Sequence, residues 1–266
     1  LMKIAPRFDW KLYLASVGHA DVTQLSVAEI EFAKAIDELV GGKSVKLEDW
    51  RTYLTWWALH ESSAGLGKAF VEETFNFYGK QLSGAKEMKP RWKRCVKAVD
   101  GTLGQALGQL FVTKYFSDRS KVETKTMVEA IEQAFLANLE TLAWMDGETK
   151  KASAEKLHKI ANQIGYPDRW LDYSKLEIAR TGYLANLRRG AAFEQHRQLA
   201  KVGKPVDRSD WGMTPPQVNA YYDPSMNMMV FPAGILQGAF YDERAHRAVN
   251  YGAIGMVMGH ELTHGF

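Results

Sequence analysis

Residues 218–232 have the sequence VNAYYDPSMNMMVFP, and this stretch differs in character from everything before it. Val218 to Asp223 alternates loosely between apolar and polar side chains, and Asp223 to Asn227 has the composition of a turn. Met228 to Phe231 is a short apolar run that ends at a proline, a residue that cannot donate to a strand ladder. The pattern predicts a short β-hairpin near residues 216–232.

Before this stretch, up to about residue 205, the chain has the periodicity of a succession of helices. Apolar residues recur at helical spacing within residues 30–39, 47–58 and 127–142. Glycine and proline breaks predict three further helices: one that begins near residue 91, one between residues 147 and 165, and one from 176 to about 201. We therefore predict a mainly α protein, with a multi-helix domain over residues 1–205 and the start of an α+β domain over residues 206–266.

Composition and charge exclude a nucleic-acid binder. The chain of 266 residues is 46% apolar and 24% charged, which is typical of a globular protein, and its formal net charge is +3. Basic residues are interleaved with acidic ones except in the run Arg91–Lys97. Because Trp92 and Val96 interrupt that run, we interpret it as a solvated helix face rather than a phosphate-binding track.

Two further classes of feature are missing from the sequence. Cys95 is the only cysteine, so no disulfide can form within the chain, and no compartment is indicated. No run of eighteen apolar residues occurs, which predicts no membrane-spanning helix in this chain.

The strongest chemical signal is His260-Glu261-Leu262-Thr263-His264, within a final helical segment of roughly residues 248–264. On a helix, His260 and His264 lie one turn apart on one face, so both imidazoles can direct a ring nitrogen at one Zn²⁺. Glu261 follows the first histidine directly. From that position its carboxylate can reach a water molecule activated by the metal, as a general base must.

The motif competes with a simpler explanation, which is a helix with two incidental histidines. With seven histidines in 266 residues, the pattern arises by chance in about one chain in a hundred. The preceding residues argue against chance, because Ile254, Val257 and Met258 predict a buried helix. A buried helix that carries two histidines and a glutamate needs something to compensate those polar groups, and a metal ion is the simplest answer.

The surrounding motifs resemble those of the neprilysin and endothelin-converting-enzyme family of zinc metalloendopeptidases, and the single cysteine favours a bacterial-type member. The resemblance covers most of the chain from about residue 50. It is carried by the following stretches, in order: Pro90–Cys95, Ile164–Asp168, Val218–Tyr222, Val230–Gln237, Asn250–Gly255 and Gly259–Phe266. It implies that residues 206–266 begin a zincin-type catalytic domain and that residues 1–205 cover its cavity.

By this resemblance, His260 and His264 are zinc ligands, Glu261 is the catalytic base, and Asn219 and Ala220 bind the backbone of an oligopeptide substrate. Asn219 would bind through its side-chain amide and Ala220 through its main chain, beside a strand edge that can accept an extended peptide. A hairpin-capping role is the alternative for Asn219. In the family, the third zinc ligand is a glutamate downstream of the second histidine. We therefore expect this chain to be a fragment that is inactive by itself.

Three hypotheses follow from the sequence. The first is a zinc metalloendopeptidase of this family, placed outside the cytoplasm as the family is, either periplasmic or secreted. The second is another zinc hydrolase with the same histidine motif, for which Asn219 and Ala220 are incidental. The third is a helical binding module without metal. Neither peptide preference nor oligomeric state can be predicted from the sequence.

Overall fold

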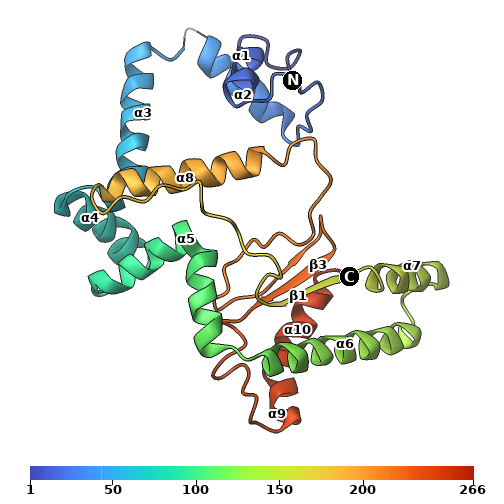
Figure 1. Ribbon diagram of the computed structural model, residues 1–266. Coiled ribbons are helices and arrows are strands. Elements are labelled where there is room, and N and C mark those ends of the chain that lie inside the picture. Colours follow the sequence, from blue (N-terminus) through green and yellow to red (C-terminus); the bar gives the residue numbers. More distant parts are fainter. Residues whose placement is uncertain (43) are drawn as a thin grey trace. The chain divides into compact units, whose positions relative to one another are not determined.

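The computed structural model of the protein describes residues 1–42 and 44–266, which form two compact units. The first unit comprises Leu1–Met88 and Arg180–Ala185, and the second comprises Lys89–Ala179 and Asn186–Phe266. Helices dominate both units, as the sequence predicts (Figure 1). The division at residue 205 concerns the catalytic domain of the family and stays a prediction.

The first unit is built of short helices, in the following order: α1 (Trp10–Ser16), α2 (Ile30–Gly41), α3 (Leu47–Ser62), the 3₁₀ turn η1 (Ser63–Gly65), α4 (Lys68–Thr74) and the π-helical segment η2 (Phe75–Leu82). Helices α2 and α3 confirm two of the predicted helices, but most of the apolar residues that predicted them, such as Leu39 of α2 and Leu47 and Leu54 of α3, are exposed. Asp37 of α2 is buried and accepts hydrogen bonds from the backbone N–H groups of Arg7 (2.6 Å) and Phe8 (3.1 Å). This carboxylate therefore anchors the first residues of the chain.

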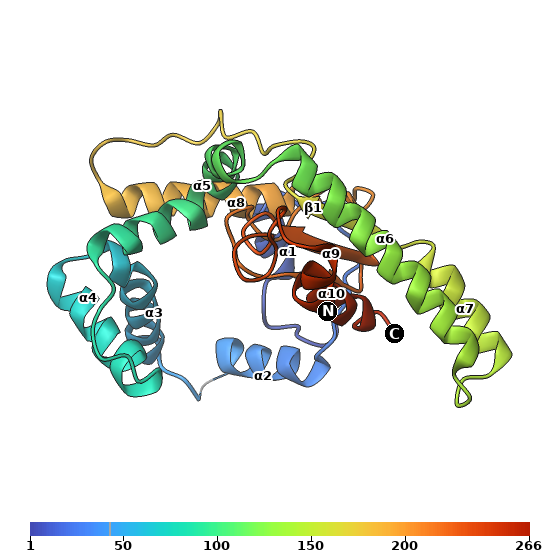
Figure 2. The same ribbon diagram turned by 90° about the horizontal axis from the view of Figure 1, so that it is seen from below.

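The second unit contains the longer helices, in the following order: α5 (Arg91–Tyr115), α6 (Asp118–Thr141), α7 (Gly147–Leu157), the larger part of α8 (Tyr183–Leu199), α9 (Arg247–Gly252) and α10 (Ile254–Thr263). Helix α5 bends at Leu103, which has non-helical backbone angles and lies close to two glycines that weaken the helix (Figure 1). Helix α7 turns back alongside α6 (Figure 2).

A small mixed sheet lies at the centre of the second unit. Its strands are β1 (Ala161–Gly165), β2 (Tyr221–Asp223) and β3 (Met228–Pro232), in the order β1-β3-β2. Strand β3 pairs in parallel with β1 and antiparallel with β2, and all five of its residues are buried. The hairpin of β2 and β3 confirms the prediction for residues 216–232, and β2 lies at an edge of the sheet.

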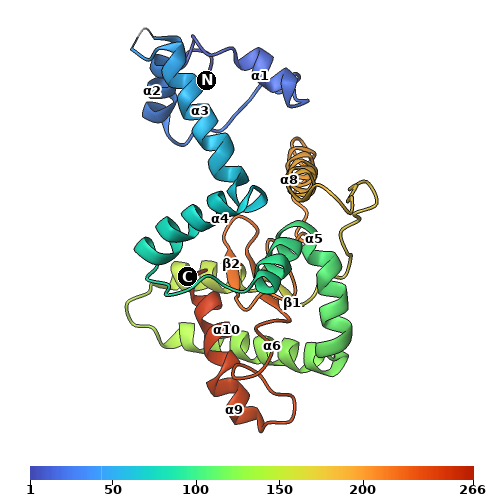
Figure 3. The same ribbon diagram turned by 90° about the vertical axis from the view of Figure 1, so that its left-hand side faces the viewer.

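The main core of the second unit is formed where helices α6 and α10 pack against the sheet region. Met127 and Val128 of α6 meet Phe231 of β3 and the apolar face of α10 in one cluster of buried side chains. Helix α10 contacts α6, α9 and β2. Figure 3 shows α9 and α10 following one another end to end. The core therefore fixes α10 on one side, along its apolar stripe.

Three expectations from the sequence are wrong in detail. The sequence predicts a helix between residues 147 and 165, but α7 ends at Leu157, and residues 161–165 form strand β1 instead. The helix expected from residue 176 begins only at Tyr183. The final helix is interrupted at Ala253, whose backbone angles (φ −101°, ψ −89°) separate α9 from α10. In each case the apolar spacing is compatible with a helix, but the tertiary contacts or a local break decide otherwise.

Within the described part of the chain, no helix is both long enough and apolar enough to cross a membrane. Cys95 lies on α5 and its thiol is exposed and unpaired.

Candidate metal centre

Helix α10 presents two different faces, and its sequence explains both. Ile254, Met258 and Leu262 follow one another at intervals of four residues and are almost completely buried, with exposed fractions of 0%, 1% and 1%. His260 and His264 are displaced from this stripe by two positions, or about 200° around a helix of 3.6 residues per turn. Both histidines are exposed. The apolar stripe thus fixes the helix so that the imidazoles face away from the core.

The two imidazoles converge. The Nε2 atom of His264 lies 3.0 Å from the Nε2 atom of His260, and the ring planes are inclined at 86° with their centroids 4.5 Å apart. Two nitrogen ligands of a tetrahedral zinc ion, each at about 2.0–2.1 Å, are about 3.3 Å apart. The observed separation is close to that value, so the donor types and their spacing both fit a zinc ion.

No third ligand joins them among residues 1–42 and 44–266. Within these residues no group of three or more histidine, cysteine, aspartate or glutamate side chains is arranged to hold a metal ion. His260 and His264 therefore form a two-ligand half-site.

Glu261 differs from the two histidines in its surroundings, because its side chain is buried, with an exposed fraction of 7%. The sequence argument that all three polar groups lie in a buried helix is therefore wrong for the histidines and right only for Glu261. Glu261 precedes His264 by three residues, which makes the two side chains neighbours on the helix surface. A carboxylate thus lies next to the metal-binding face.

Asn219 and Ala220 lie immediately before strand β2. Asn219 is exposed and Ala220 is buried, with an exposed fraction of 7%. Strand β2 pairs with β3 on one side, and within the described residues no strand pairs with its other side. Because α10 also packs against β2, the edge strand and the histidine helix are direct neighbours.

The sequence analysis did not identify Lys156, which secures the C-terminal end of α10. Its ammonium group donates to the backbone carbonyl of Gly265 and lies over the rings of Tyr222 (5.7 Å to the centroid) and Phe266 (5.3 Å). A cation at this end of a helix satisfies a carbonyl group that has no partner within the helix and interacts favourably with the helix dipole. Lys156 lies on α7, more than one hundred residues away along the chain, so no local signal could have found it.

Gly265 also allows the end of α10 to approach strand β2 closely. A Cβ atom on Gly265 would lie 3.1 Å from the Cζ atom of Tyr222 and 3.2 Å from its hydroxyl oxygen. The Tyr222 hydroxyl donates to Oδ1 of Asn227 (2.9 Å), and Nδ2 of Asn227 donates to the carbonyl of Lys156 (3.0 Å). These contacts join the hairpin, α7 and the end of the histidine helix into one connected set.

Two family profiles, both described as peptidase family M13, match this chain over residues 1–167 and 219–266. The chain is 41% identical over 221 residues to an endothelin-converting enzyme homolog of Locusta migratoria, covering 80% of this chain and 30% of that protein. It is 35% identical to human endothelin-converting enzyme 1 over 277 residues, covering 100% of this chain and 36% of that protein.

Solved structures give the same result. A zinc metalloprotease of Mycobacterium tuberculosis, in complex with an inhibitor, superposes with a TM-score of 0.92 at 40% identity, covering all of this chain and 40% of that one. The fold, a helical region followed by the beginning of a zincin-type domain, is therefore shared with solved metalloproteases. This chain spans well under half the length of these relatives.

Proposed function

Since the chain belongs to peptidase family M13, we propose that it is part of a zinc metalloendopeptidase in which His260 and His264 are zinc ligands and Glu261 is the general base. The observation that carries this proposal is the 3.0 Å separation of the two Nε2 atoms on the exposed face of α10. This separation is close to that of two nitrogen ligands on one tetrahedral zinc ion.

In the proposed hydrolysis of a peptide bond, this chain contributes three side chains: two histidines that hold zinc and one glutamate that transfers a proton. Zinc, when bound, supplies Lewis acidity toward a scissile carbonyl group and makes a water molecule easier to deprotonate. Glu261 then accepts a proton from the attacking water and passes it to the leaving amine. Because its side chain is buried, few rotamers are open to it, which favours a fixed position beside the histidines.

Strand β2 supports the substrate class. An extended peptide can add to an open sheet edge through main-chain hydrogen bonds, and β2 is such an edge beside the histidine helix. We propose that the backbone of Ala220 and the side-chain amide of Asn219 bind the main chain of an oligopeptide there. Residues 206–266 would then begin the catalytic domain, and residues 1–205 would cover its cavity.

We also propose that the complete protein acts outside the cytoplasm and that it needs a third zinc ligand from outside this chain to be active. Both statements rest on the family resemblance, and the second is supported by the two-ligand half-site. Secretion or export of the complete protein, tested by cell fractionation, checks the first.

The experiment that tests the function is a zinc and peptidase assay on the complete protein. We expect about one zinc ion per chain, and hydrolysis of a quenched fluorescent oligopeptide that stops when zinc is removed and returns when it is added back. The Glu261→Gln variant should keep its zinc and lose about 10²–10⁴-fold in kcat, because the proton acceptor is gone. Glu155→Gln, which changes an exposed glutamate of α7, serves as the control.

Each component can fail separately. A zinc-loaded Glu261→Gln variant with the turnover of the wild type would overturn the assignment of the base. A complete protein that binds no zinc would overturn the proposal as a whole and favour a binding module. Asn219→Ala should raise KM by about 2- to 12-fold at unchanged kcat, which is the loss expected for one hydrogen bond that holds substrate and transition state equally.

A further inference from the structure

We propose that Arg197 of helix α8 is a positioning residue for peptide binding, because its ion pair with Asp210 and the hydrogen bond from Gly212 to Tyr221 connect α8 to strand β2. The proposal rests on the proposed function of Asn219 and Ala220. It adds residues that do not touch the substrate themselves but hold in place the segment that does.

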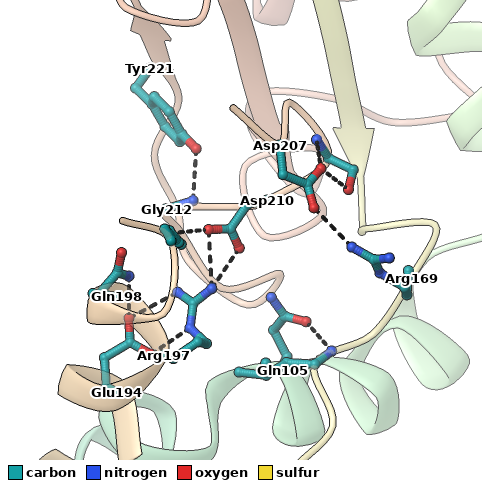
Figure 4. A network of polar contacts seen from close by, with 12 residues as sticks. Gln105, Arg169, Glu194, Arg197, Gln198, Asp207, Asp210, Gly212 and Tyr221 are labelled. Carbon is teal, nitrogen blue, oxygen red and sulfur yellow. Dashed lines mark hydrogen bonds and ion pairs between the residues drawn. The ribbon is translucent and has the colours of Figure 1, made fainter. Parts of the chain in front are cut away.

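Arg197 lies between two carboxylates (Figure 4). Its Nε and one terminal nitrogen donate to the two oxygens of Glu194 (2.8 and 2.9 Å), and its other terminal nitrogen donates to both oxygens of Asp210 (2.8 and 3.0 Å). The side chain of Arg197 is 23% exposed and that of Asp210 is 19% exposed. The contact with Glu194 is bidentate and holds the guanidinium group in place, so that its other terminal nitrogen can donate to Asp210. Both side chains of the pair with Asp210 are partly buried, and such a pair fixes geometry better than an exposed one does.

The surroundings of Arg197 balance its charge. Lys201 also reaches Asp210, with its ammonium nitrogen 2.5 Å from Oδ2. The cluster therefore contains two cations and two carboxylates, and Gln198 donates to Glu194 as well. Replacement of Arg197 by an uncharged side chain would remove its ion pairs with Glu194 and Asp210 and leave Asp210 paired with Lys201.

Asp210 begins a short path to the edge strand. Two residues further on, the backbone N–H of Gly212 donates to the hydroxyl oxygen of Tyr221 (2.9 Å), the first residue of β2 (Figure 4). This hydrogen bond closes a loop over residues 212–221 that contains both Asn219 and Ala220. Burial raises the pKa of Tyr221, so its hydroxyl stays protonated at neutral pH and the contact does not change with ionisation there.

Other contacts fix the same loop to the unit around it. The indole N–H of Trp211, the residue directly before the loop, donates to Oε1 of Gln163 on β1 (3.0 Å), and the hydroxyl of Thr214 within the loop donates to Oδ1 of Asp100 on α5 (2.6 Å). Thr214 fits so closely against α5 that a Cβ atom on Gly104 would lie 2.1 Å from its Cγ2 atom. The loop is thus bound at several points, and the ion pair at Arg197 fixes its beginning.

A rigid loop before β2 lowers the conformational entropy that is lost when a peptide binds to the strand. A peptide that adds to β2 meets a strand edge that is already ordered, so less conformational freedom is lost on binding. Loosening the beginning of the loop should therefore weaken substrate binding and leave the chemical step unchanged. That combination is a rise in KM without a fall in kcat.

The chain offers a matched control on the same segment. Arg169 pairs with Asp207 at 2.9 Å, but both side chains are well exposed, at 78% and 52%. Asp207 lies three residues before Asp210 and has no hydrogen bond to Gly212 or Tyr221 in the described structure. Loss of this second ion pair should therefore change neither peptide binding nor the order of β2.

The test compares Arg197→Met, Arg197→Lys, Tyr221→Phe and Arg169→Met in the complete protein. The readouts are KM and kcat for a quenched fluorescent oligopeptide, and hydrogen exchange of the backbone amides of residues 219–223. Arg197→Met and Tyr221→Phe should each raise KM by about 2- to 12-fold, with kcat unchanged and exchange accelerated. Arg197→Lys should recover part of the loss, because lysine keeps the charge but not the bidentate geometry.

The outcomes separate this proposal from the proposed function. Unchanged KM and unchanged exchange in Tyr221→Phe, which removes one oxygen only, would overturn the positioning role even where Arg197→Met fails to fold. A fall in kcat at constant KM would overturn it as well. If the complete protein cleaves no peptide, the proposed function fails, while the exchange of residues 219–223 still decides whether Arg197 holds the strand.

Discussion

Helix α10 and strand β2 are neighbours in the second unit, but they are held in place by different kinds of contact. Helix α10 is fixed by Ile254, Met258 and Leu262, which are buried in the main core. Strand β2 is short, and although Tyr222 also packs against the main core, polar contacts add to its support: Tyr221 accepts from Gly212, and Tyr222 donates to Asn227.

The difference shows how the two halves of the candidate site depend on the rest of the chain. The spacing of the two histidines follows from helix geometry alone, so it survives as long as the helix stays packed. The edge strand depends on hydrogen bonds from separate segments, each of which can be lost singly at a cost of about 0.5–1.5 kcal/mol. We therefore expect abrupt failure in α10 and graded failure in β2.

The largest effect should follow removal of one histidine. His264→Ala in the complete protein should weaken zinc binding by more than the about 10–100-fold that follows loss of an outer partner of a metal ligand, and peptidase activity should fall with it. Hydrogen exchange of residues 221–223 should stay as in the wild type, since polar contacts elsewhere hold β2. His158→Ala, at another exposed histidine, is the control. Faster exchange in β2 would show that the two regions are not independent.

A second test uses two methionines of the same helix. Met258 is 1% exposed and Met256 is 63% exposed. Met258→Ala should lower the free energy of unfolding by about 2–5 kcal/mol, because it leaves a cavity in the core. Met256→Ala should change it by less than about 0.5 kcal/mol. Chemical denaturation measures both, and equal losses would mean that α10 is not fixed by its apolar stripe.

A smaller effect is expected at the end of α10. Lys156→Met removes the cation that donates to the carbonyl of Gly265, and it should destabilise the last turn by about 0.3–1 kcal/mol. Hydrogen exchange of the amides from residue 262 onward should accelerate by about 2- to 5-fold, and Lys156→Arg should restore most of the protection. Lys151→Met, at an exposed position of the same helix α7, should have no effect. Unchanged exchange in Lys156→Met would show that Lys156 does not stabilise the last turn of α10.

The smallest effect concerns Glu132 of α6, at the other edge of the sheet. Burial raises its pKa above the ordinary value of 4.5, although Asn162 of β1 donates to its carboxylate (2.8 Å) and opposes the shift. Because the folded state binds this proton more tightly than the unfolded state does, protonated Glu132 stabilises the fold. The stabilisation is fully present below pH 4.5 and is lost as the pH rises through the raised pKa of the folded state. In the wild type the free energy of unfolding should therefore decline as Glu132 loses its proton. The Glu132→Gln variant, which has no proton to lose at this position, should lack that decline. Parallel pH profiles of the two proteins would contradict it.

The parts of the fold that the sequence predicts are those that local pattern determines. The helices α2, α3, α5 and α6 follow from apolar spacing and from glycine or proline breaks. Strand β1 could not be predicted in this way. Its residues continue the apolar spacing of the helix before them, and it is a strand because it pairs with β3, more than sixty residues further along the chain.

The residues of the candidate site also fall into those that local sequence predicts and those that only the tertiary fold brings together. The histidine motif is contained in five consecutive residues, and its geometry follows from the period of the helix. The exposure of His260 and His264 could also have been predicted, since they are displaced by two positions from the stripe of Met258 and Leu262. Lys156 and Arg197 could not, because each acts on a segment that only the tertiary fold brings close.

Cys95 on α5 offers a practical consequence. It is the only thiol of this chain and it is exposed, so a maleimide dye can be attached at a single known position without any substitution. The same α5 carries Asp100, which holds Thr214 in the loop that leads to β2. A dye at Cys95 therefore sits on a helix in contact with that loop. Its fluorescence lifetime or anisotropy, measured as an oligopeptide is added, tests the peptide binding that we propose at β2 without any need for bond cleavage.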